Sequence, residues 1–312
     1  MLRSYRFPVL VALILTATLA LVPQSGLASG KPGESGFLSL RLGVGTRETA
    51  MGGTGVAATS GAAAIYWNPA KLPFTDHDTD LLLQHQGWLG LFHKEAAALA
   101  HRTTFGELGF FFSGFYSDDI ERYGSEPVGI PEGTFAPYDV VVGVSFARKV
   151  YETIAVGVSI KSLYEKIDVD SGSGIAFDLF LAHKAVIEGL YLAASVTNIG
   201  QDMTIAEDPF NLPTAVRLGA AYDPAQPLFA GKLTLAADLI MPNDGNDKAH
   251  VGAEYRLLPE LALRVGSKVN YDSQGLTAGF GLRRGPLEVG YSFEDMDNDL
   301  DPAHKFSLEL HY

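Results

Sequence analysis

Most of this chain is a succession of segments, about ten residues long, in which apolar side chains alternate with polar or small ones. In the stretch LALRVGSKVN, for example, Leu263 and Val265 fall on one face, and Arg264 and Lys268 fall on the other. Successive side chains of a β-strand point to opposite faces, so this period of two predicts strands rather than helices. Turn residues separate the segments, which indicates antiparallel hairpins.

About fourteen such segments follow residue 78, and an even number of ten-residue strands is typical of a transmembrane β-barrel. A soluble β-propeller or sandwich is the alternative, but its strands are nearer five or six residues. It also does not need one face free of charge in every strand. We therefore expect an all-β fold, a 14-stranded antiparallel barrel over 79–312. The segments are expected to start near Leu81, Glu95, Phe105, Asp139, Thr153, Gly174, Leu190, Thr214, Leu233, Ala249, Leu261, Leu276, Leu287 and Lys305.

The loops predict which end of the barrel faces outward. Long, acidic loops follow the odd-numbered segments: YSDDIERYGSEPVGIPEGTFAP, IDVDSGS, NIGQDMTIAEDPFNLP, MPNDGND and EDMDNDLDP. The loops after even-numbered segments, such as HRTT and RRGP, are mostly short, with DPAQPLFAGK intermediate. Outer-membrane barrels have long extracellular loops and short periplasmic turns. The residues before the first strand should then lie on the periplasmic side.

Charged residues inside the strands fix which face points to the lumen, because an Arg or Lys at the lipid midplane costs about 2–4 kcal/mol. This set can either line a ligand pathway or form an interior network of paired charges. The expected lumen residues are Arg217, Asp238, Glu254, Arg264, Lys268 and Arg283, with Glu288 and Glu309 following by the same alternation.

The third segment, FGELGFFFSGFY, has aromatic residues on both faces. One set must point inward. It forms either an apolar binding patch inside the barrel, or a structural contact with a plug or an aromatic girdle. The two sets are Phe105, Phe111 and Phe115 on one face, and Phe110, Phe112 and Tyr116 on the other.

The first residues predict a signal peptide over 1–28. Arg3 and Arg6 precede an uncharged apolar run, and small residues around Ala28 suit a cleavage site. A retained anchor is the alternative, although the run is shorter than the roughly 20 residues of a spanning helix. The chain has no Cys, which fits an exported protein.

Other function classes find little support. The net charge of -13 argues against nucleic-acid partners. GTGVAA lacks the strand and helix of a dinucleotide site, and no zinc-protease or serine-hydrolase motif is present. We expect no enzyme activity, no cofactor and no metal ligands. The carboxylates of DMDNDLD, from Asp295 to Asp301, leave weak calcium binding open.

The segment 29–78 has the properties of a barrel plug. Its glycines Gly52, Gly53 and Gly55 allow close backbone approach. Asn68 followed by Pro69 predicts the start of a short helix, with Asn as the N-cap. Tyr66 and Trp67 would anchor the segment by burying large rings.

The same segment resembles the front motif of the PorV/PorQ family of outer-membrane proteins. The matching residues are Ala50-Met51-Gly52-Gly53, Gly55-Val56 and Tyr66-Trp67-Asn68-Pro69-Ala70, although Lys71 replaces the Gly that family members often carry. That family is similar in turn to FadL-type barrels, which have fourteen strands and an N-terminal hatch containing Asn-Pro-Ala. The resemblance implies that Met51 and the plug residues named above gate a ligand path.

The resemblance implies two different functions. FadL-like barrels pass hydrophobic molecules across the outer membrane, whereas PorV-like barrels receive exported cargo for a secretion system. Secretion-system proteins or a hydrophobic small molecule are therefore the expected partners, together with the lipid bilayer. The final Tyr312 resembles the signal read by the barrel-assembly machinery, and we expect the protein in the outer membrane of a Gram-negative-type bacterium. A structural or adhesive barrel that binds through its acidic loops is the alternative.

Overall fold

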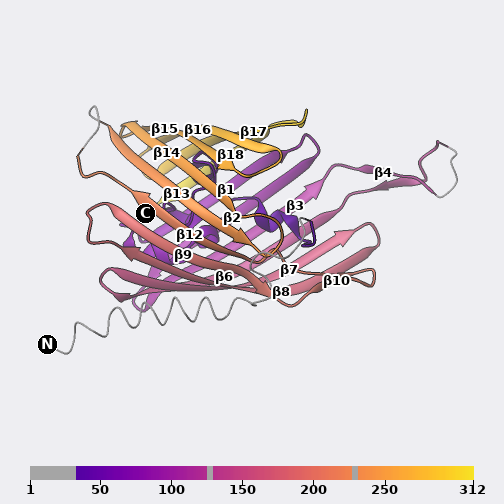
Figure 1. The fold of residues 1–312 in the computed structure, drawn as a ribbon, viewed down its shortest axis with the longest axis horizontal. Coiled ribbons are helices and arrows are strands. Elements are labelled where there is room, and N and C mark those ends of the chain that lie inside the picture. The colour runs from indigo at the N-terminus through magenta and orange to yellow at the C-terminus, as the bar shows by residue number, and fades with distance from the viewer. Residues whose placement is uncertain (1–32, 125–128, 227–230) are drawn as a thin grey trace.

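Fourteen antiparallel strands close into a barrel in which β1 pairs with β18 (Figure 1). The computed structural model describes residues 33–124, 129–226 and 231–312. The predicted signal peptide lies outside these residues. The barrel strands are β1 (Thr79–Trp88), β2 (Phe92–Thr103), β3 (Gly106–Ser117), β6 (Tyr138–Tyr151), β7 (Ile154–Ile167), β8 (Asp170–Lys184), β9 (Leu190–Gly200), β12 (Ala215–Tyr222), β13 (Lys232–Pro242), β14 (Lys248–Leu258), β15 (Leu261–Val269), β16 (Gln274–Arg284), β17 (Leu287–Met296) and β18 (Ala303–His311).

The alternation of side chains predicted this architecture, and the fourteen-stranded barrel is confirmed. Every barrel strand begins within about four residues of its expected start, because turn residues delimit the segments clearly. The faces follow the pattern as well: Val265 is 55 % exposed on the outside, whereas Arg264 is 4 % exposed and points inward.

One predicted loop is wrong. The stretch IDVDSGS is not a long loop, because β7 continues to Ile167 and β8 begins at Asp170. The pairing Ile167↔Asp170 closes this hairpin with a two-residue turn, and Asp168 adopts a φ of 53° there. Polar residues in this stretch extend the strands because the hairpin reaches beyond the apolar band.

The two ends of the barrel differ. From one end, here called the long-loop end, the hairpins β4 (Ile120–Arg122) with β5 (Gly133–Phe135) and β10 (Met203–Ile205) with β11 (Asp208–Phe210) project, opposite the C-terminus (Figure 1). At the other end, the short-turn end, links such as 104–105, 152–153 and 285–286 contain two residues.

Short helices fill the lumen. They are η1 (Leu38–Arg41), α2 (Thr46–Ala50), η2 (Gly61–Ala63), α3 (Ala64–Trp67) and η3 (Pro69–Phe74), and they form the indigo segment inside the ring of strands (Figure 1). Most side chains between Val44 and Leu72 are buried. None of the described helices has the length and hydrophobicity needed to cross a membrane.

Candidate functional site: a cavity floored by the plug

Trp67 is the centre of the plug. Its indole Nε1 donates a hydrogen bond of 2.6 Å to the carbonyl of Val44. A Cβ at Gly55 would lie 2.1 Å from the indole ring, so only glycine fits there. The neighbouring Tyr66 hydroxyl donates to the Leu40 carbonyl at 2.7 Å. Burial raises the pKa of Tyr66 to about 12, although Arg217 acts in the opposite direction, so the phenol remains a donor at neutral pH.

Asn68 joins the plug to the barrel wall. Its side-chain oxygen accepts from the Ala70 backbone N–H at 3.0 Å and so caps η3, where Pro69 is the first residue. Its amide nitrogen donates to the carbonyls of Val56, at 3.0 Å, and of Leu181 in β8, at 3.2 Å. The expected helix start is therefore present as a 3-10 turn.

The glycines after α2 allow the plug backbone to touch the strands directly. Gly52 has a φ of 76°, and a Cβ there would lie 2.6 Å from the Val251 carbonyl oxygen. Its N–H donates to the Thr277 hydroxyl at 2.9 Å. Gly53 follows with its carbonyl 3.1 Å from His250 Nδ1, and Met51 is fully buried beside it. Larger residues at these positions would separate the plug from the wall.

Several inward charges of the strands bind the plug. Arg47 of α2 pairs with Glu254 at 3.0 Å, and Arg264 contacts Glu254 and Glu288 at 2.7 Å each. A carboxylate oxygen of Asp238 accepts the backbone N–H of Val56 at 3.0 Å. These groups therefore form an interior network that holds the plug.

The other three predicted lumen residues lie in different surroundings. The Arg217 guanidinium lies 5.4 Å from the Trp67 ring centroid, and Lys268 pairs with Glu294. Arg283 lies at the short-turn end, 3.5 Å from His77 Nε2. Of the six predicted residues, only Arg217 also borders the cavity described below.

Sequence reasoning missed two buried lysines that hold the plug. Lys94 Nζ donates to the Ser39 carbonyl at 3.0 Å, and Lys305 Nζ donates to the Gly43 carbonyl at 2.7 Å. The cost of exposing a charge to lipid, which placed Arg264 inside, also applies to these lysines, since each lies on the inward face of its strand. Small inward residues in β2, such as Ala98, are a second signal that the plug approaches closely.

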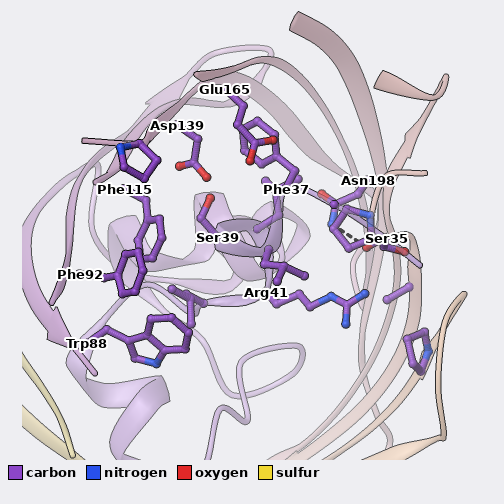
Figure 2. Close-up of a pocket in the computed structure, with 18 of the residues that line it drawn as sticks. Ser35, Phe37, Ser39, Arg41, Trp88, Phe92, Phe115, Asp139, Glu165 and Asn198 are labelled. Atoms are coloured by element: carbon purple, nitrogen blue, oxygen red, sulfur yellow. Dashed lines mark hydrogen bonds between the residues drawn. The ribbon is translucent and has the colours of Figure 1, made fainter. Parts of the chain in front are cut away.

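A cavity of about 580 Å³ lies above the plug at the long-loop end. Its apolar wall is a cluster of three rings, Trp88, Phe92 and Phe115, shown at the left of Figure 2. The Phe92 and Phe115 rings stack with centroids 5.4 Å apart, and the Trp88 ring lies 5.8 Å from Phe92. Phe37 of the plug contributes to the floor.

Polar and charged groups line much of the rest of the cavity, and Asp139 is the cross-strand partner of Phe115. Figure 2 shows the Asp139 carboxylate directed towards the Ser39 hydroxyl, with Glu165 beside it. Within the described part of the chain, Trp88 Nε1 and Glu165 Oε2 have no hydrogen-bond partner. Arg41 is neutralised by its ion pair with Asp244. The three-ring wall suits the apolar part of a small molecule.

The aromatic strand serves two purposes. Phe111 packs against Tyr66 of the plug at a centroid distance of 5.5 Å, and Phe115 lines the cavity. Phe110, Phe112 and Tyr116 are exposed on the outside. The prediction for Phe105 is wrong: it precedes β3 in the turn, is 57 % exposed and stacks on Phe146. The turn breaks the alternation before the strand begins.

Solved structures provide the comparison with known proteins. The toluene transporter TodX of Pseudomonas putida is similar over 86 % of this chain and 99 % of its own, with a TM-score of 0.64 and 14 % identity. The Ralstonia pickettii toluene transporter TbuX is similar over 86 % of this chain and 98 % of its own, with a TM-score of 0.59 and 15 % identity. A Pseudomonas aeruginosa FadL homologue is similar over 86 % of this chain and 98 % of its own, with a TM-score of 0.58 and 10 % identity.

The fold is that of the FadL-type transport barrels. No protein-family model matches the sequence. No curated protein matches it either. The FadL-type fold thus rests on structural similarity, at identities too low to transfer a ligand.

Proposed function

We propose that this protein is an outer-membrane barrel of a Gram-negative-type bacterium that binds a neutral hydrophobic molecule at its long-loop end and passes it inward. The long-loop end then faces the cell exterior. The three-ring wall of Trp88, Phe92 and Phe115 is the observation that supports this function. The FadL-type fold and the similarity to TodX, a toluene transporter, point in the same direction. The function is non-enzymatic.

Binding of naphthalene to the purified barrel in detergent tests this proposal, with empty micelles as the blank. Trp88→Ala and Phe115→Ala each remove one ring of the wall, and we expect about tenfold weaker binding. Phe306→Ala is the matched control, because Phe306 is 52 % exposed on the outer face. Equal naphthalene binding by the wild type and both wall variants would rule out the cavity as the binding site.

A PorV-like role in protein secretion is the second candidate. The hairpin β4–β5 projects well beyond the barrel at the long-loop end, where a protein partner could reach it (Figure 1). Replacing residues 118–137 by a short turn should then abolish cargo release at the cell surface while naphthalene binding stays unchanged. Normal cargo release from this variant would argue against the secretion role.

A further inference from the structure

Three side chains with metal-binding atoms meet at the short-turn end, where the first and last strands close the barrel. Asp80 lies in β1, and its partner across the β1–β18 pairing is His311. His77 belongs to the connector that leads from η3 into β1. The antiparallel register therefore brings together two residues separated by 231 positions, and the connector adds the third.

The three groups are close enough to share one ion. Asp80 Oδ1 lies 2.6 Å from His311 Nδ1 and 3.3 Å from His77 Nδ1. One ligand atom from each residue lies within 4.8 Å of the others. Tetrahedral Zn²⁺ with bonds of about 2.0 Å separates its ligand atoms by about 3.3 Å. The Asp80–His77 distance already equals this value, and the Asp80–His311 contact would need to open slightly.

We propose that His77, Asp80 and His311 form a Zn²⁺ site that ties the plug connector to both strands of the barrel seam. Two imidazoles and one carboxylate suit Zn²⁺, whereas Ca²⁺ and Mg²⁺ prefer oxygen ligands alone. The His77 side chain is 32 % exposed, so solvent can reach the site and supply a water as the fourth ligand. The site is independent of the cavity at the opposite end and goes beyond the proposed function.

The surroundings both support and oppose the ion. Glu309 Oε2 lies 3.9 Å from His311 Nε2, where a carboxylate can orient a metal-binding imidazole. Arg283 lies 3.5 Å from His77 Nε2 and adds a positive charge that disfavours a cation. Gly61 of the plug is in contact: a Cβ there would lie 3.2 Å from His311 Cε1. A bound ion would therefore also fix the base of the plug.

The experiment measures Zn²⁺ affinity of the full chain, purified in detergent without a histidine tag, by competition with a chromophoric chelator. We expect one Zn²⁺ per chain and at least about tenfold weaker binding in His77→Ala. His77 lies outside the strands, so this variant keeps the β1–β18 pairing. Arg283→Gln should bind Zn²⁺ more tightly, because it removes the opposing charge. His183→Ala, which changes a half-buried histidine bonded to the Thr153 carbonyl, should bind Zn²⁺ like the wild type.

Cobalt substitution gives a second measurement. Co²⁺ at this site should show the visible absorption of a tetrahedral complex, and His77→Ala should lose it. Unchanged Zn²⁺ affinity in His77→Ala would overturn the proposal, as would displacement of Zn²⁺ by equimolar Ca²⁺. Equal affinities in Arg283→Gln and the wild type would also contradict it, since a simple hydrogen-bonded cluster would not respond to this change.

Discussion

The packing of Trp67 against glycine explains the order of residues in the plug. The indole occupies the space that side chains at Gly43 and Gly55 would need: a Cβ at either position would lie within 2.6 Å of the ring. Protein interiors are close-packed, so one extra methyl group in such a contact displaces its neighbours.

Gly55→Ala should therefore destabilise the closed plug by about 1–3 kcal/mol. Limited proteolysis of the purified barrel can measure this as faster cleavage within residues 37–74. Gly87→Ala is the control, because a Cβ at Gly87 has no neighbour within 4 Å. Equal cleavage rates for both variants would mean that the contact with Trp67 is unimportant.

Tyr312 lies at the barrel seam, and its side chain is 70 % exposed. Its backbone N–H donates to the Thr79 carbonyl at 2.8 Å, so deleting the residue removes pairing as well as the ring. Tyr312→Ala separates these effects because it keeps the backbone. If the ring is an assembly signal, Tyr312→Ala should lower the amount of folded barrel as strongly as the deletion does. Normal yields from Tyr312→Ala would assign any loss to the backbone bonds.

At the scale of elements, the plug is held to the wall around its whole circumference. Three wall side chains form hydrogen bonds with the plug backbone: Lys94 of β2, Asp238 of β13 and Thr277 of β16. In addition, Asn68 of the plug donates to a backbone carbonyl of β8. A segment fixed on several sides closes the lumen more firmly than one fixed at a hinge.

The double substitution Trp67→Ala with Asn68→Ala should loosen the plug without unfolding the strands. In planar bilayers, we expect low conductance from the wild type and higher conductance from the double variant and from a deletion of residues 37–74. Phe306→Ala, on the outer face, should conduct like the wild type. High conductance from all of these proteins would show an open pore.

Lys71 gives the plug a pH dependence. Burial lowers the pKa of Lys71 to about 7, although Asp223 acts in the opposite direction, and its Nζ lies 3.4 Å from the Tyr191 ring centroid. An opened plug would restore an ordinary pKa near 10.5. Between pH 7 and about 10, the open form binds the extra proton, so closure becomes more favourable as pH rises.

We therefore expect proteolysis of the plug, relative to Lys71→Met at the same pH, to slow between pH 7 and 10. Comparing the two proteins at each pH removes the pH dependence of the protease. A constant ratio across this range would show that Lys71 keeps the same charge in the open and closed plug.

The strands could be predicted from the sequence more easily than the cavity. The alternation of side chains placed Arg264 and Val265 on opposite faces, because the bilayer and the lumen impose that alternation on every strand. The cavity was harder to predict. Trp88 and Phe92 stand at strand ends, where no alternation distinguishes an inward ring from an interfacial one, and only the register brings them to Phe115.

At the scale of the whole molecule, the outer surface is an apolar band that covers every strand. Leu218, Leu239, Val251 and Leu282, on four different strands, are all exposed. A surface of this kind needs lipid around it. We expect the protein to remain in the membrane after carbonate extraction and to migrate differently on gels before and after heating. Recovery in the soluble periplasmic fraction would contradict this.

The bonds between the plug and the last strands also constrain the order of folding. Thr46 contacts Ser307, and Gly43 accepts a bond from Lys305, across separations of 261 and 262 residues. The plug is synthesised first, yet part of its binding surface is synthesised last. Contacts between residues so far apart in the sequence form slowly, so we expect the docking of the plug and the pairing of β1 with β18 to be late events in folding.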